Sequence, residues 1–155
     1  TRSGFNQVNA YAGSRIDAYK KYENIYDIVL YLPRAIQIGF LSPFPSDWYK
    51  YSNINNISKG TTVGAIGYFL ASVETIVWYI LLLGFIYITY KNPSVVKPLL
   101  VVFLFSIAVI VLLGYVVPNV GAIYRMRQAY MIPFYLFGAQ GLSLMINNFT
   151  KKQHK

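Results

Sequence analysis

Three long apolar stretches follow one another in the second half of the chain. The first covers 63–90 with Glu74 as its one charged residue, the second covers 98–117 without a charge, and the third, shorter and more polar, covers 129–146. Because a helix of about 20 apolar residues crosses a bilayer core, each stretch predicts a transmembrane helix. The intervening segment 118–128 combines a proline, a glycine and two arginines, and predicts a short loop.

A different pattern precedes these stretches. Apolar residues recur three and four positions apart within 24–44, at Ile25, Ile28, Val29, Leu32, Ile36 and Phe40. This is the spacing of one helix face, and Asp27, Arg34 and Gln37 make the rest polar, so the segment predicts an interfacial helix rather than a span. The expected fold is therefore an all-α integral membrane protein, with three transmembrane helices in 62–155 and an amino-terminal amphipathic interfacial helix within 1–61.

The third stretch differs from the other two in its small and polar residues. Gly138, Gln140 and Gly141 lie within one turn of the predicted helix. Small residues let transmembrane helices approach closely, and a glutamine favours protein neighbours over lipid. We therefore expect this helix to pack against other helices, of the same or another chain.

Composition supports the membrane assignment and narrows the chemistry. The chain of 155 residues is 55% hydrophobic and 12% charged, with a mean hydropathy of +0.41, which excludes a water-soluble globular domain. There is no cysteine, and the single histidine, His154, lies in the basic tail. Thiol chemistry, a histidine zinc site and a Ser-His-Asp triad are therefore excluded within this chain, and we expect neither a metal nor a cofactor.

The net charge of +9 arises from 14 basic and 5 acidic residues. In a soluble protein this excess would suggest nucleic acid. Here the basic residues lie at the ends of apolar runs, where they anchor helices at lipid headgroups, so we expect membrane lipid and no nucleic acid as partner.

Orientation follows from the basic residues near the span ends. Five lysines, at 91, 97, 151, 152 and 155, fall on one side, and Lys50, Lys59, Arg125 and Arg127 fall on the other. The positive-inside rule then places the basic carboxy-terminal tail in the cytoplasm and 1–61 outside. Because the chain begins with Thr1 and has no signal peptide, we expect a processed or truncated chain that further spans or a cleaved leader once preceded.

Glu74 is the first candidate for chemistry. A carboxylate inside a span costs about 2.5–3.5 kcal/mol, so it requires a partner, a wet cavity or neutralisation. Three interpretations stay open: an ion pair with Arg125 or Arg127 that sets helix register, a carboxylate that orients or deprotonates a substrate hydroxyl, and an uncharged acid hydrogen-bonded in the core.

Arg125 and Arg127 form the second candidate site. Residues two apart on a helix point about 200° away from each other, so one can face the bundle while the other reaches headgroups. A guanidinium binds phosphate in a bidentate manner, and a helix amino terminus within 121–129 would add its dipole to the same anion. The alternative is that both arginines extend to lipid phosphate.

Aromatic residues suggest a third candidate. Trp48 and Tyr49 follow the proline-rich end of the interfacial helix. Their faces can stack on sugar rings, although anchoring at the membrane interface and setting the angle of the helix are the competing interpretations.

Three segments together resemble a known group of proteins: YLPRAIQIGFLSPFPSDW, ETIVWY and PNVGAIYRMRQAYMIPFYLFGAQGL, within 26–145. The resemblance is to the carboxy-terminal part of multi-span bacterial membrane proteins of cell-envelope polysaccharide assembly, which are glycosyltransferase-like or O-antigen polymerase-like. It implies a terminal portion that handles polyprenyl-linked saccharides at the outer face of the cytoplasmic membrane.

Under this resemblance one arginine of the Asn119-x-Gly121-x-x-x-Arg125-x-Arg127 stretch would bind diphosphate, and Glu74 would be the acid of the pocket. Such enzymes have more spans than the three found here. A noncatalytic helical subunit of a larger membrane complex, or part of a sugar or lipid transporter, are the alternatives.

Overall fold

The computed structural model describes the backbone of residues 15–48 and 62–153. Within these ranges the elements are α2 (Ile25–Leu41), α3 (Pro45–Trp48), α4 (Thr62–Lys91), α5 (Pro93–Val96), the 3₁₀ turn η2 (Lys97–Leu99), α6 (Leu100–Val116) and α7 (Val120–Gln153). Among the described residues, 3 stretches are long and apolar enough to cross a membrane: Phe69–Lys91, Pro93–Val116 and Val120–Lys151. The expected all-α membrane fold with an additional amino-terminal helix is confirmed.

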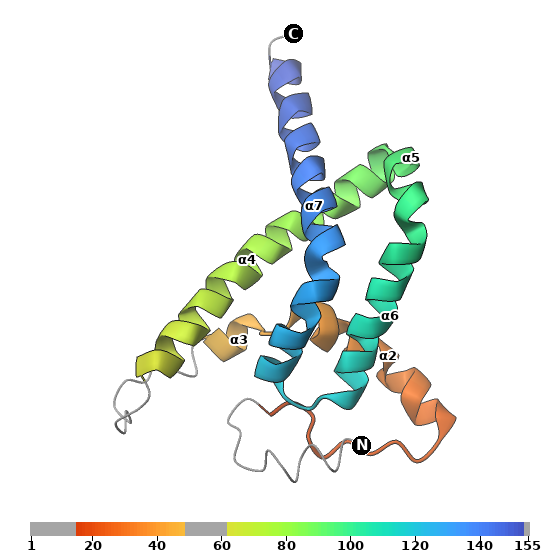
Figure 1. The fold of residues 1–155 in the computed structure, drawn as a ribbon, viewed down its shortest axis with the longest axis vertical. Helices are drawn as coiled ribbons and strands as arrows, with labels where there is room; N and C mark the ends of the chain where they lie inside the picture. Colours follow the sequence, from red (N-terminus) through yellow and green to blue (C-terminus); the bar gives the residue numbers. More distant parts are fainter. Residues whose placement is uncertain (1–14, 49–61, 154–155) are drawn as a thin grey trace.

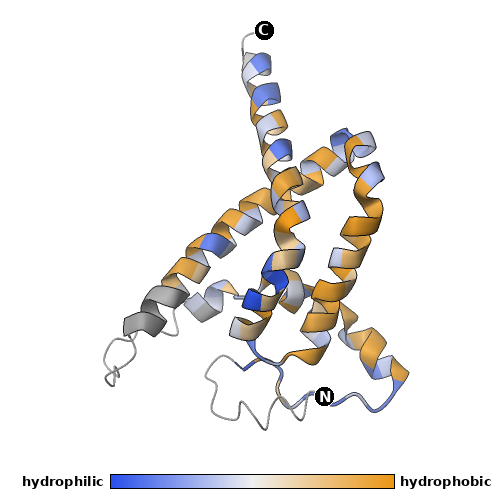
Figure 2. Cartoon of the chain, viewed as in Figure 1, coloured by the Kyte–Doolittle hydropathy of each residue, from blue (hydrophilic) through white to orange (hydrophobic). Residues whose placement is uncertain are grey.

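The spanning helices form an open bundle (Figure 1). α4 and α6 meet at α5 and diverge from it, and α7 crosses α4. α2 and α3 lie at the end of the bundle opposite α5, where α6 ends and α7 begins. The segment before α2 reaches the same end, because the backbone N–H of Ile16 donates to the carbonyl of Pro118 at 3.0 Å. The outer faces of α4 and α6 are largely apolar, as expected for surfaces in contact with lipid (Figure 2).

Glycines set the crossing of α4 and α7. A Cβ atom added at Gly141 would overlap the backbone carbonyl of Gly84, and one added at Gly138 would overlap the carbonyl of Leu81. The two backbones are therefore in direct contact, which is the close packing that small residues allow in membranes. The prediction that this part of the third span packs against another helix is confirmed for Gly138 and Gly141, whereas Gln140 is exposed.

A second close approach joins α2 to α6. A Cβ at Gly114 would overlap the carbonyl of Ala35, and one at Gly39 would lie 2.6 Å from the carbonyl of Ile110. The carboxy-terminal half of α2 is therefore packed into the bundle. Its first half is different, because Ile25, Tyr26 and Leu30 are exposed. An apolar surface of this kind at the end of a bundle suits the membrane interface.

The predicted loop over 118–128 is wrong. α7 begins at Val120, so both arginines lie on a helix that is longer than the expected 129–146. The helix can begin early because the side-chain oxygen of Asn119 accepts a hydrogen bond from the backbone N–H of Ala122 at 3.0 Å, the bond of an amino-terminal cap. In the sequence, the glycine and the two arginines favour a loop more strongly than the single cap residue favours a helix.

Asp27 stabilises the start of α2. Its carboxylate accepts hydrogen bonds from the backbone N–H groups of Glu23 at 3.0 Å and Asn24 at 3.3 Å. These bonds hold the pKa of Asp27 below its usual value. They also pair backbone donors that have no partner within the helix.

This cap predicts a pH dependence of the first turn of α2. Because the pKa of Asp27 is lowered in the folded chain, the cap is fully formed above the ordinary aspartate pKa of about 3.9 and is lost as the pH falls through the lower folded value. The amide proton shifts of Glu23 and Asn24 should titrate below pH ~3.9 and should not titrate in Asp27→Asn. A midpoint at or above the ordinary value would contradict the cap.

Candidate functional site

A polar cluster joins α4 to the first turns of α7. The carboxylate of Glu74 accepts a hydrogen bond from the hydroxyl of Tyr124 and, on its other oxygen, one from Gln128 Nε2 at 2.6 Å. The hydroxyl of Tyr135 donates to Gln128 Oε1 at 3.0 Å. We call Glu74, Tyr124, Gln128 and Tyr135 the Glu74 cluster.

Helix geometry places the cluster near one end of the bundle. Tyr124 and Gln128 are four residues apart, and Tyr135 follows seven residues later, so all three lie on one face of α7. Glu74 lies midway along α4, yet it meets the beginning of α7 because the two helices cross obliquely (Figure 1). The carboxylate therefore lies beside the first turns of α7.

The bonding of Glu74 bears on two of the three interpretations of this residue, the ion pair and the acid buried in the core. The one ion pair within 4.0 Å in the described part of the chain joins Arg34 Nε to Asp17 Oδ2 at 2.9 Å. The interpretation of Glu74 as the partner of Arg125 or Arg127 in an ion pair is therefore wrong. The two oxygens of Glu74 instead accept hydrogen bonds from the neutral side chains of Tyr124 and Gln128. Its side chain is exposed, so it is not an acid buried in the core.

Arg127 lies behind the cluster and is almost completely buried, with 2% exposure. Its Nη1 donates to the carbonyl of Gly39 at 2.7 Å, and its guanidinium lies 5.9 Å from the ring centroid of Tyr124. Gly39 belongs to the last turn of α2, whose carbonyls lack partners within the helix and carry the negative end of its dipole. Arg127 therefore fastens α2 to α7.

Two side chains of α4 bind the same end of α2. Trp78 Nε1 donates to the carbonyl of Phe40 at 2.7 Å, and the hydroxyl of Tyr79 donates to the carbonyl of Leu41 at 2.6 Å. We call Trp78, Tyr79 and Arg127 the α2 clamp. Three consecutive carbonyls are thus paired inside the bundle, where an unpaired one would be costly.

Arg125 points elsewhere. It is exposed, whereas Arg127 is buried, so the expectation that residues two apart face opposite sides of the helix is confirmed. Arg125 lies on the same turn of α7 as Tyr124 and is available to an anion at this end of the bundle.

The remaining candidate residues have local roles. Asn119 caps α7, and Trp48 Nε1 donates to the carbonyl of Pro43 at 3.2 Å, within the connection between α2 and α3. Tyr49 lies outside the described residues. No group of three or more potential metal-binding His, Cys, Asp or Glu side chains lies together in the part of the chain that the structure describes.

Sequence reasoning missed most partners of the candidate residues. Tyr124 and Gln128 have the i, i+4 spacing of side chains on one helix face, which was a usable signal. The prediction of a loop over 118–128 hides this signal. Trp78 and Tyr79 stand in the quoted ETIVWY segment, but nothing in their spacing indicates that they bind carbonyls of α2.

No family model, no curated protein sequence and no solved structure matched the chain.

Proposed function

We propose that this chain is the terminal part of a polytopic membrane protein that transfers or polymerises polyprenyl-linked saccharides at the outer face of the bacterial cytoplasmic membrane. The observation that supports this is the exposed carboxylate of Glu74, which Tyr124 and Gln128 hold in a fixed orientation. A carboxylate held in this way can orient a sugar hydroxyl and accept its proton. The cluster lies near the end of the bundle at which α7 begins, within reach of a headgroup.

Under this proposal the two arginines have different tasks. Arg125 is exposed on the turn of α7 that carries Tyr124, and its guanidinium binds the diphosphate of the lipid carrier. Arg127 is engaged by the carbonyl of Gly39 and acts as a positioning residue that holds α2 beside the site. Asn119 and Trp48 shape the same end of the bundle, and Trp48 and Tyr49 are the candidates for stacking on sugar.

The topology of the proposal follows from the charged ends of the spans. The end of the bundle with α2 and the Glu74 cluster faces the outside, and the end with Lys91, Lys97 and Lys151 faces the cytoplasm. Figure 1 places α5 and the end of α7 away from α2, which is consistent with this assignment.

Glu74→Gln in the native polypeptide tests the proposal. Glutamine keeps the size of the side chain and an acceptor oxygen but cannot take up a proton, so transfer from a polyprenyl-diphosphate-linked oligosaccharide should fall about 10²–10⁴-fold. The helical content and detergent-solubilised mass should not change. Thr89→Val, on the same helix at an exposed position, is the matched control and should keep activity.

Full activity of Glu74→Gln would overturn the role of Glu74. Arg125→Gln should raise the KM for the lipid-linked substrate and leave kcat nearly unchanged, because the guanidinium binds the diphosphate and not the reacting hydroxyl. Equal losses in kcat and in kcat/KM would contradict that role.

A noncatalytic helical subunit is the second candidate function, and the broad exposed apolar faces of α4 and α6 favour it (Figure 2). The intact mass of the native polypeptide in detergent separates the two. A mass near 17.7 kDa would favour the subunit, whereas a mass several times larger would favour the terminal part of a polytopic enzyme.

A further inference from the structure

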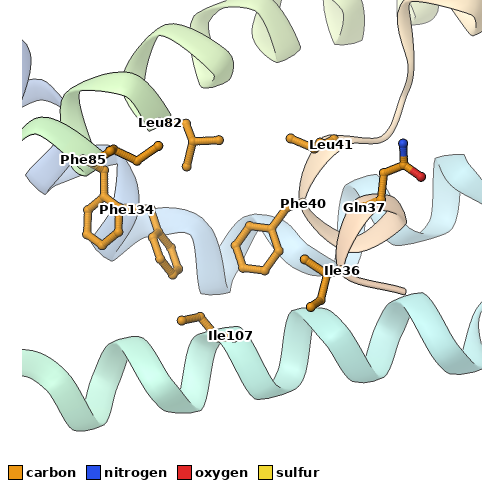
Figure 3. Close-up of a pocket in the computed structure, with 9 residues that line it drawn as sticks. Ile36, Gln37, Phe40, Leu41, Leu82, Phe85, Ile107 and Phe134 are labelled. Carbon is orange, nitrogen blue, oxygen red and sulfur yellow. The ribbon is translucent and has the colours of Figure 1, made fainter. Parts of the chain in front are cut away.

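An apolar cavity of about 420 Å³ lies between four helices (Figure 3). Its wall includes Ile36 and Phe40 of α2, Leu82 and Phe85 of α4, Ile107 of α6 and Phe134 of α7. The rings of Phe40 and Phe134 point into the space between α4 and α6 in Figure 3. A volume of this size falls in the range of small-ligand pockets, about 300–1,000 Å³.

The wall of the cavity provides almost no group that could form a hydrogen bond with water. Gln37 is the one polar residue beside it, and its amide oxygen accepts a hydrogen bond from Arg34 Nη1 at 2.7 Å. Figure 3 shows this amide directed away from the neighbouring rings. A buried water needs two to four polar partners, so water does not fill a space of this kind.

The cavity lies at the depth of lipid chains and opens towards them. Each of the three spanning helices contributes a wall residue from well inside its span. Leu82 lies in Phe69–Lys91, Ile107 in Pro93–Val116 and Phe134 in Val120–Lys151. Phe134 is 2% exposed and forms the floor, whereas Ile36, Ile86 and Ile107 are 42%, 57% and 37% exposed and form the rim. The opening therefore lies among α2, α4 and α6, and in a bilayer the medium at the depth of Ile86 and Ile107 is hydrocarbon.

We propose that an acyl chain of a bilayer phospholipid occupies this cavity. The chain gains contacts with Phe40, Phe85 and Phe134 that an empty cavity would forfeit, and it requires no polar partner. It would also complete the packing of the last turn of α2, which the α2 clamp holds in place. The proposal does not depend on the function proposed above, because it involves neither Glu74 nor a saccharide.

Tryptophan fluorescence can report on the occupant. The chain has two tryptophans. Trp78 is 1% exposed, and its ring centroid lies 6.5 Å from that of Phe40 and 6.2 Å from that of Phe134. Trp48→Phe leaves Trp78 as the only emitter. In vesicles of phosphatidylcholine with brominated acyl chains, an acyl chain in the cavity should quench Trp78 emission relative to vesicles without bromine.

Filling the cavity should remove this quenching. Ile107→Phe on α6 and Ile86→Phe on α4 each place a ring at the rim, from opposite sides, and both positions are exposed enough for the fold to be retained. Leu112→Phe is the matched control, because Leu112 is exposed on α6 and lies about 140° around the helix from Ile107. The two rim variants should lose most of the bromine-dependent quenching, and the control should keep it.

Three results would overturn the proposal: no bromine-dependent quenching of Trp78, an equal loss in Leu112→Phe, or no loss in either rim variant. A further arm tests the identity of the chain. If substoichiometric polyprenyl phosphate restores Trp78 emission, the occupant is an isoprenoid chain and the phospholipid assignment is wrong. Glu74→Gln should leave the quenching unchanged, so this experiment can fail or succeed independently of the proposed function.

Discussion

Trp78→Ala should lower the free energy of unfolding by about 3–4 kcal/mol, the lower part of the range for removing a core tryptophan. Trp78 is 1% exposed and its ring packs against Phe40, Phe134 and Tyr135, at centroid distances of 6.5, 6.2 and 5.6 Å. Because the unfolded helices are surrounded by lipid and not by water, exposing the site gives only a small hydrophobic loss of stability. Most of the expected loss in free energy therefore comes from the missing packing contacts. The substitution also leaves the carbonyl of Phe40 without its donor.

Unfolding of the chain in mixed micelles with increasing SDS, followed by circular dichroism, measures this loss. Trp78→Phe is the matched control: it keeps a ring in the packed layer and removes the N–H group, so it should cost only about 1 kcal/mol. Since α2 is the element released, trypsin should cleave after Arg34 faster in Trp78→Ala than in Trp78→Phe. Equal stability of the two variants would mean that the ring does not hold α2.

The three spans were accessible from sequence because hydropathy reports directly on the bilayer. The apolar stretch 63–90 became α4 (Thr62–Lys91), and 98–117 became α6 (Leu100–Val116) with η2 before it. In both cases lipid contact decides the element, and the pattern needs no knowledge of neighbouring helices.

The start of α7 was not accessible in the same way, because tertiary contacts decide it. Arg127 reads as a loop residue or a headgroup anchor, yet in the fold it is 2% exposed and donates to Gly39, 88 positions earlier in the chain. The cap that Asn119 provides is a local signal. This signal predicts the start of α7 only when it is also known that the carbonyl of Gly39 in α2 pairs with the buried guanidinium of Arg127.

The Glu74 cluster could also be predicted only in part. The sequence marked Glu74 as an unusual residue within a span, and this stands. Its partners depend on the angle and register at which α4 crosses α7, and neither hydropathy nor spacing contains that information. Gly138 and Gly141 indicated a close contact but not the helix that makes it.

The contact between Gly141 of α7 and Gly84 of α4 leads to the second prediction with a large effect. Gly141→Leu should lower the free energy of unfolding by about 2 kcal/mol or more. A Cβ at this position would overlap the backbone carbonyl of Gly84, and a backbone cannot move aside as a side chain can. Overpacking costs about 1–3 kcal/mol, and a backbone contact belongs at the upper end. Leucine regains about 1 kcal/mol in helix propensity, so the overlap decides the sign.

Ala139→Leu is the matched control, because Ala139 is exposed and lies about 200° around α7 from Gly141. The same unfolding titration should show a change within about 0.5 kcal/mol for this variant. Equal stability of Gly141→Leu and Ala139→Leu would show that α4 and α7 do not touch at Gly84. The crossing also sets the register that brings Tyr124 and Gln128 to Glu74, so Gly141→Leu should reduce any activity that depends on Glu74, while Ala139→Leu should not.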